Sequence, residues 1–122
     1  MKSHWITHKD KRILYCDYTN FSLSDFDKLV AELDGVEALL SPEAEGSVLG
    51  LTDIRGSVAS KEVIDLFKKR ATRTAKYVRK QAVVGVTGWK KVLHDAVMRI
   101  TGLHAKAFDD LEQAKEWLVS EE

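Results

Sequence analysis

The segment 81–102, QAVVGVTGWKKVLHDAVMRITG, constrains the fold of this chain more than any other part of it. Its first residues form an apolar run, which predicts a strand over 82–87 that is covered on both faces of a sheet. From Trp89 onward the apolar residues recur every three or four positions, which indicates an amphipathic helix that Gly102 ends. A strand that runs through two glycines into a helix favours an α/β domain with parallel strands.

Apolar spacing elsewhere in the chain predicts the remaining strands and helices. Residues 4–7 and 12–18 alternate with a period of two around the polar turn HKDK, which predicts an antiparallel hairpin. From Ser24 the spacing lengthens to that of a helix, so we expect a capped helix there, with an interruption near Gly35. The other predicted strands cover 47–54 and 104–108, and the other helices begin near Ser60 and Asp109.

The helical pattern also predicts which side chains face inward. We expect Val78 on the inner face of the second helix and Val92 in the apolar stripe of the third, while Asp109 caps the last helix with Glu112 in a D-x-x-E box. Crossover connections between parallel strands are right-handed, so the later strands should be parallel. We therefore predict one α/β domain over 1–122 with a mixed sheet: an N-terminal antiparallel hairpin and then parallel β-α units, with about five strands and four helices.

The composition limits the class of protein. With 122 residues, of which 44% are hydrophobic and 31% charged, the chain can close one core. No apolar run approaches the roughly 18 residues of a membrane-spanning helix, and the start of the chain is polar. Cys16 is the only cysteine and cannot form an internal disulfide, so we expect a reducing, cytoplasmic location.

The charges are segregated along the chain although the net charge is zero. The segment between Arg12 and Arg55 contains nine acidic residues and one lysine. The segment between Asp65 and Asp95 contains nine basic residues and no acidic one. Two interpretations follow. The charges form poles that steer an anionic partner or favour contact between copies of the chain, or they are the solvated faces of two helices.

The opening hairpin, the strand ending in LTDIRG, and segment 81–102 running into AFDDLEQAKEWL resemble the SpoIIAA-like family, which is grouped with STAS and SEC14-type domains. This resemblance covers nearly the whole chain and implies the SpoIIAA-like (STAS-type) fold. Such families include anti-sigma factor antagonists, which bind partner proteins and are switched by phosphorylation of a serine, and larger relatives that hold lipids. The Asp-Ser-Ser-Gly motif of that serine is absent from the comparable loop, TDIRGSVASK, where Ser57 and Ser60 lie nearby.

Ligands of open parallel sheets bind in the crevice beyond the carboxyl ends of the strands, so we expect a ligand or partner site there. The glycine corner at 85–88 could also hold a small anion at the start of a helix, although it lacks the longer glycine motifs of nucleotide sites. The alternative is that these glycines only shape the turn. The candidate site residues are Asp53, Arg55, Gly56, Ser57, Ser60, Thr87, Gly88, Trp89 and Lys90.

No catalytic or metal-binding pattern stands out in the sequence. The four histidines show no HxH or HExxH spacing, and no nucleophile elbow is present. We therefore predict no enzyme activity, no catalytic or metal-ligating residue and no cofactor.

The sequence favours a non-enzymatic interaction module that binds a protein partner, with a regulatory role, and that assembles with itself as a homodimer or higher oligomer. The alternative is a small carrier that holds an apolar or lipid-like ligand between helices and sheet, although a chain this short leaves little room for a large pocket. A small anionic ligand also stays open. Nucleic-acid binding by segment 68–91 is disfavoured, because the total charge is neutral and aromatic residues are few there.

Overall fold

The computed structural model describes residues 1–58, 60–102 and 105–121, and the side chains of Trp89 and Ile100 lie outside the described part. Strands and helices alternate after an initial hairpin, as the sequence predicts. Short 3-10 turns at Leu23–Asp25 and Ala75–Tyr77 precede α1 and β4. In chain order the elements are β1 (His4–His8), β2 (Lys11–Asp17), α1 (Phe26–Leu40), β3 (Val48–Asp53), α2 (Lys61–Thr74), β4 (Val78–Val84), α3 (Trp89–Thr101), β5 (Ala105–Phe108) and α4 (Leu111–Val119).

The five strands form one mixed sheet in the order β1-β2-β3-β4-β5. β1 and β2 are antiparallel, and every later pair is parallel. The hairpin turn consists of Lys9 and Asp10, both at positive φ (49° and 67°), as a tight two-residue turn requires. The predicted hairpin, parallel β-α units, five strands and four helices are confirmed.

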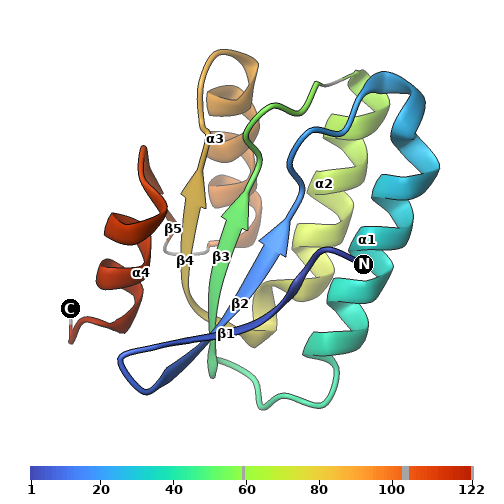
Figure 1. Cartoon of the computed structure of the whole chain (residues 1–122). Helices are drawn as coiled ribbons and strands as arrows, with labels where there is room; N and C mark the ends of the chain where they lie inside the picture. The colour runs from blue at the N-terminus through green and yellow to red at the C-terminus, as the bar shows by residue number, and fades with distance from the viewer. Residues whose placement is uncertain (59, 103–104, 122) are drawn as a thin grey trace.

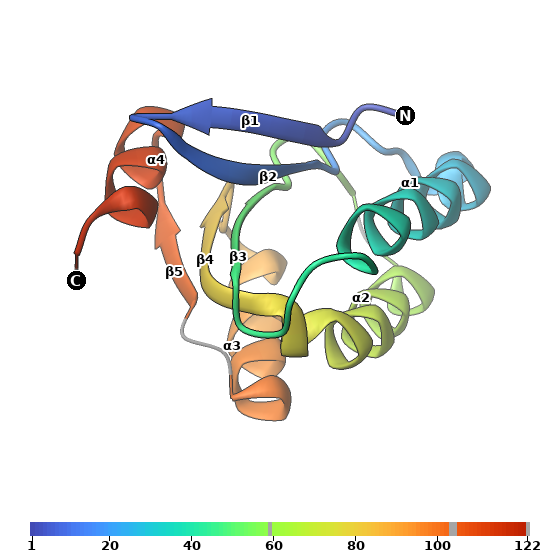
Figure 2. The ribbon, with the colours of Figure 1, turned by 90° about the horizontal axis from the view of Figure 1, so that it is seen from below.

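The strand order places three helices on one face of the sheet. Successive parallel strands lie side by side, so right-handed crossovers bring α1, α2 and α3 to the same face, and α4 covers the opposite face (Figures 1 and 2). Alternate residues of each strand therefore enter different cores. In β2, Leu14 and Cys16 pack toward α1–α3, whereas Ile13 packs toward α4.

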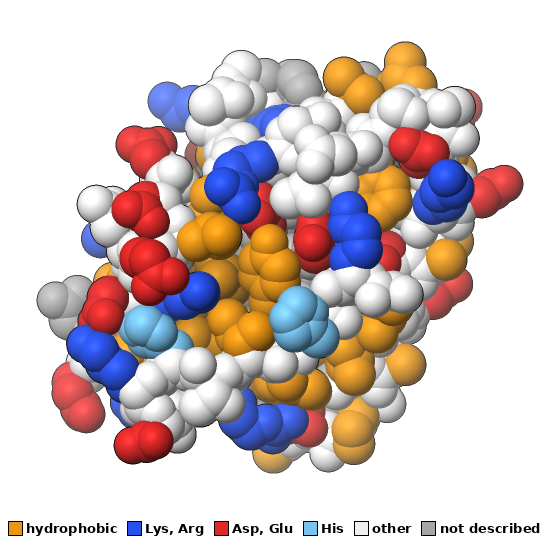
Figure 3. Space-filling model, in the orientation of Figure 1, with side chains coloured by type: hydrophobic (Ala, Val, Ile, Leu, Met, Phe, Trp, Pro, Cys, Tyr) orange, Lys and Arg blue, Asp and Glu red, His pale blue; other side chains and the backbone are white. Residues whose placement is uncertain are grey.

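The α4 face continues beyond the buried core as partly exposed apolar surface. Ile6, Tyr15, Phe108 and Trp117 are half-buried and pack against the core under α4. In the space-filling view, apolar side chains gather in the middle of this face with charged side chains around them (Figure 3).

Several predicted boundaries are wrong, and packing explains them. α1 runs through Gly35 without a break, and a side chain at this position would collide with Met1. The N-cap at the start of this helical segment is Ser22, in a capping box with Asp25, rather than Ser24. Val78 begins β4 instead of continuing α2.

The strand predicted over 82–87 lies earlier, at Val78–Val84. The sequence pattern missed the first residues of β4 because they include the charged residue Lys80. Lys80 is nevertheless only 5% exposed. Its ammonium donates to the carbonyl of Trp117 at 2.8 Å and to that of Ser120 at 3.3 Å. A lysine at the carboxyl end of α4 complements the free carbonyls and the negative end of the helix dipole.

Two further details of the late helices are corrected. Val92 is 71% exposed and does not belong to the inner stripe of α3. Asp110, not Asp109, caps α4, and its carboxylate accepts the backbone N–H of Glu112 at 2.7 Å. The first residue of the strand predicted over 104–108 lies outside the described residues. In the part of the chain that the structure describes, no helix is both long and apolar enough to cross a membrane.

The segregated charges partly meet across the pair α1 and α2. Arg70 lies 2.6 Å from the carboxylate of Asp34, and Arg73 lies 2.6 Å from that of Glu37. The acidic helix and the basic helix therefore neutralise each other along their shared edge.

Candidate functional site

The carboxyl end of β3 holds a network around a buried carboxylate. Asp53 is fully buried and accepts hydrogen bonds from the Tyr15 hydroxyl at 2.7 Å and from the Arg55 guanidinium at 2.9 and 2.7 Å. Burial raises the pKa of Asp53, but hydrogen bonds from Arg55 and Tyr15 outweigh it and lower the pKa. Burial and the Asp53 carboxylate raise the pKa of Tyr15. Asp53 is thus a fixed anion, and it orients Arg55, whose side chain is 52% exposed.

The glycine corner packs against this network. Gly85 has φ +97°, and a Cβ there would come within 2.8 Å of the Arg55 backbone nitrogen. The close neighbour of Gly85 is therefore the loop after β3. Thr87 and Gly88 are exposed, and the side chain of Trp89 lies outside the described residues.

The loop after β3 is tied to the loop after β2 by residues that the sequence nominated as ligands. The Ser57 hydroxyl donates to the Tyr18 carbonyl and accepts the Phe21 backbone N–H at 3.0 Å. Gly56, at φ +74°, lies against Asn20, where a side chain would collide. Both residues join the two loops.

Two further candidates also have structural partners. Ser60 is the N-cap of α2 and accepts the backbone N–H of Val63 at 3.2 Å. Lys90 is 7% exposed, and its ammonium donates to the Ile54 carbonyl at 2.7 Å. Burial lowers the pKa of Lys90. The nominated residues therefore do not converge on one pocket: Asp53 lies on the α4 face, whereas Lys90 lies on the helix-layer face.

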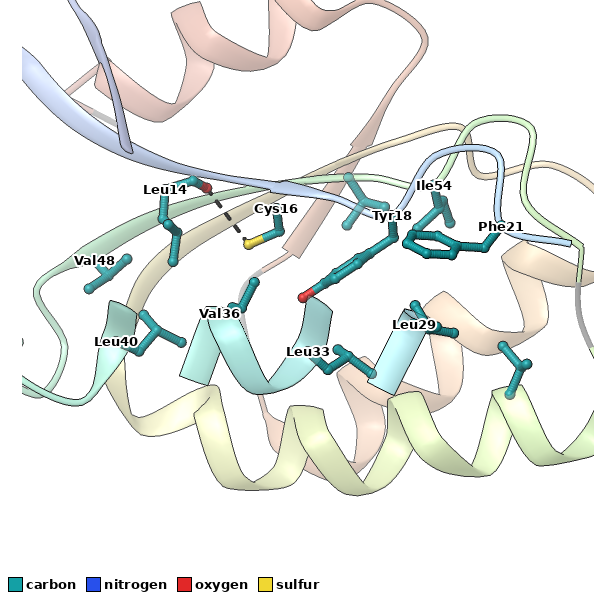
Figure 4. Close-up of a cluster of buried hydrophobic side chains, with 12 residues drawn as sticks. Leu14, Cys16, Tyr18, Phe21, Leu29, Leu33, Val36, Leu40, Val48 and Ile54 are labelled. Carbon is teal, nitrogen blue, oxygen red and sulfur yellow. Dashed lines mark hydrogen bonds between the residues drawn. The ribbon is translucent and has the colours of Figure 1, made fainter. Parts of the chain in front are cut away.

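The feature that the sequence analysis missed is a cavity of about 150 Å³ between the sheet and the three-helix layer. Side chains of β2 and of α1 point toward each other across this core (Figure 4). The cavity is lined by Leu14, Cys16, Tyr18, Leu33, Val36, Glu37, Leu40, Val48, Gly50, Thr52, Ile54, Phe67, Arg70, Ala71, Thr74, Val78, Gln81, Val83, Lys90, Leu93, His94 and Val97.

The cavity wall is mainly apolar and carries a few polar groups. The Gln81 amide donates to the Thr52 hydroxyl, and Arg70 pairs with Asp34 and, at 3.6 Å, with Glu37. His94 is half-buried, and burial lowers its pKa, so the imidazole is neutral near pH 7. Burial raises the pKa of Cys16 to about 12, so its thiol is unreactive.

One signal in the sequence could have indicated this cavity. Gly50 supplies no side chain to the middle of β3, and Thr52 and Gln81 place polar atoms on the inner face of two central strands. A glycine inside a strand often marks a place where another group approaches closely, and at Gly50 that group is the Gln81 amide. Among the described residues, no group of three His, Cys, Asp or Glu side chains could hold a metal ion.

Comparisons with known proteins agree with this architecture. A family model described as SpoIIAA-like matches residues 14–119. A search of curated proteins finds no match. Among solved structures, the chain is similar to an uncharacterized protein with a SpoIIAA-like fold from Shewanella loihica, at 16% identity and a TM-score of 0.68, with 95% of this chain and 91% of that chain covered.

Proposed function

The chain belongs to the SpoIIAA-like family, and we propose that it acts as a binding module that holds a small apolar molecule between its sheet and α1–α3. This is the carrier alternative that the sequence left open. The lining offers shape, apolar contact and a few hydrogen-bonding groups, which suit binding rather than bond making.

The observation that supports the proposal is the cavity itself. Protein interiors are normally close-packed, and an empty volume costs about 24 cal/mol per Å³. A fully enclosed cavity of about 150 Å³ would cost about 3–4 kcal/mol on this scale, and the partly open cavity here costs less, which is still a large part of the ~5–15 kcal/mol that holds a domain together. A bound molecule would restore these contacts and the stability that they carry.

Titration with toluene, followed by the methyl NMR signals of the protein, tests the proposal. We expect signals of Leu33, Val36 and Val97, which line the cavity, to shift, while those of Leu51 and Leu118 on the α4 side stay in place. Lining methyls that do not move at saturating toluene would contradict the proposal.

Two matched variants control for contact elsewhere on the surface. Ala71→Leu adds a side chain to the cavity wall, so toluene should no longer bind. Ala38→Leu makes the same change at an exposed position of α1 and should leave binding unchanged.

Contact with a protein partner is a second candidate function, supported by two exposed apolar side chains on adjoining loops. Leu23 is 61% exposed and Val58 is 49% exposed, and the Val58 backbone N–H donates to the Phe21 carbonyl at 3.0 Å. Arg55 is exposed on the same loop as Val58. Arginine is enriched at protein interfaces, and covering the two exposed apolar side chains would be favourable.

Light scattering over a range of protein concentrations tests self-association through these loops. We expect a concentration-dependent dimer that Leu23→Ser together with Val58→Ser abolishes. A mass that stays monomeric at every concentration, or a dimer that survives both changes, would remove this surface as the contact between copies.

A further inference from the structure

The size of the cavity limits its ligand to a compact molecule. A cavity of about 150 Å³ holds one molecule of about benzene's size, whereas sites for drug-sized ligands occupy about 300–1,000 Å³. The cavity is partly open at its surface, so it would hold only a part of a long acyl chain and would take up a compact molecule whole.

The wall of the cavity suits a ring. Tyr18, which directly follows β2, and Phe67 of α2 meet edge to face, with ring centroids 5.3 Å apart, and both line the cavity. Aromatic rings attract a further ring placed edge-on or offset, and this adds to the gain from apolar burial. A ligand with polar groups at both ends, or with a charged group, would find few partners on this mainly apolar wall.

The imidazole of His94 lines the cavity and makes no hydrogen bond with the described part of the chain. Other polar groups of the wall have partners, and the Tyr18 hydroxyl shares a hydrogen bond with the Cys16 thiol. Gln81 donates to Thr52, Arg70 pairs with Asp34, and Lys90 donates to the Ile54 carbonyl. A ligand that reaches the wall thus finds its hydrogen-bonding group at His94.

The protonation state of His94 indicates which ligand group would match it. Burial lowers the pKa of this histidine, and a neutral imidazole carries one N–H donor and one acceptor nitrogen. A hydroxyl group both donates and accepts, so it can pair with either ring nitrogen. A carboxylate would lose its hydration beside a neutral imidazole, and both cations of the wall already have partners: Arg70 pairs with Asp34, and Lys90 donates to the Ile54 carbonyl.

We infer that the cavity takes a compact, uncharged ring that carries one hydroxyl group, of the phenol class, with the hydroxyl at His94 and the ring packed against the Tyr18–Phe67 pair. This inference rests on the proposed function, because it names the ligand of the same cavity. His94 is then the residue that determines specificity, and the apolar wall supplies the affinity.

The test compares phenol, toluene, benzoate and decanoate as ligands of the wild-type protein and of His94→Leu, with NMR titration at pH 7.5. We expect the wild type to bind phenol about five- to tenfold more tightly than toluene, as one hydrogen bond in a buried site gives. In His94→Leu this preference should disappear while toluene still binds. His94→Gln, which keeps a donor and an acceptor, should retain part of it.

His4→Leu serves as the matched control, because His4 lies on β1 and contacts Tyr15 rather than the cavity. It should leave the preference for phenol intact.

Each other outcome overturns a different statement. Equal binding of phenol and toluene to the wild type, or a preference that His94→Leu keeps, would overturn the role of His94 and leave the proposed function standing. Tighter binding of benzoate or decanoate than of phenol would overturn the uncharged, compact class. Failure of every one of the four molecules to reach the cavity would overturn the proposed function as well.

Discussion

The two faces of the sheet are closed in different ways. On one face, α4 alone packs on side chains that are completely buried, such as Ile13, Leu51 and Val84. On the other face, three helices cover the strands and leave the cavity. A single terminal helix can settle into the curve of the sheet, whereas α1, α2 and α3 are held by their connections and by each other. Close packing is therefore a property of one face and not of the whole molecule.

The largest expected effect is a difference in stability between two Leu→Ala variants, one on each face of the sheet. Leu51 faces α4 and Leu14 faces the cavity, and both are at most 1% exposed. We expect Leu51→Ala to lower the free energy of unfolding by about 4 kcal/mol and Leu14→Ala by about 2–3 kcal/mol, because a side chain beside an existing void has fewer contacts to lose. Urea unfolding measures both values. Equal losses would mean that the cavity side is packed as well as the other.

A smaller effect is expected from the carboxylate network at the edge of the α4 face. Asp53→Asn weakens the hydrogen bonds from Arg55 and Tyr15, and should cost about 2–3 kcal/mol at pH 7. The pKa of Asp53 is lowered in the folded protein, so its stabilisation is present above the ordinary aspartate pKa of about 4 and is lost as the pH falls through the folded value.

Unfolding curves at pH 7 and at successively lower pH values check this expectation. The difference between wild type and Asp53→Asn should shrink as the pH falls below about 4. A difference that is the same at every pH would show that the charge of Asp53 contributes nothing to stability.

The smallest expected effect is that of Ala→Leu on stability. This change should destabilise the protein on the α4 face and stabilise it on the cavity face. Ala114 of α4 is completely buried, so Ala114→Leu should overpack its core and cost about 1–3 kcal/mol. Ala71 of α2 lines the cavity, so Ala71→Leu should fill part of it and raise stability by about 1 kcal/mol. Thermal unfolding measures both changes. Destabilisation by Ala71→Leu would mean that the cavity cannot accept side-chain atoms.

The order and type of the elements could be predicted from residues alone, because spacing records burial. The apolar run before Gly85 and the period of the segment after Trp89 both describe one element packing on another. The predicted element boundaries were wrong where a polar side chain is buried and its hydrogen-bond partner is far away in the sequence. Lys80 in β4 is buried against the end of α4, 37 residues away from it in the chain, and a reading of local spacing does not include that partner.

The candidate site shows the same limit more strongly. Topology correctly places Asp53 and Arg55 at the carboxyl end of β3, yet the hydroxyls of Ser57 and Ser60 serve the loops and the helix cap. His94, one of the four histidines that show no metal-binding spacing, lines the cavity. Whether the nominated edge residues bind anything stays a prediction.

The sequence by itself determined the succession of strands and helices, the mixed sheet and the family, because these depend on periodicity and on short turns. Only the tertiary structure decided where packing is incomplete, since a cavity is the space left over when rigid helices meet a curved sheet. That space is bounded by residues from β2, β3, β4 and all three helices of the layer, and no local stretch of residues encodes it.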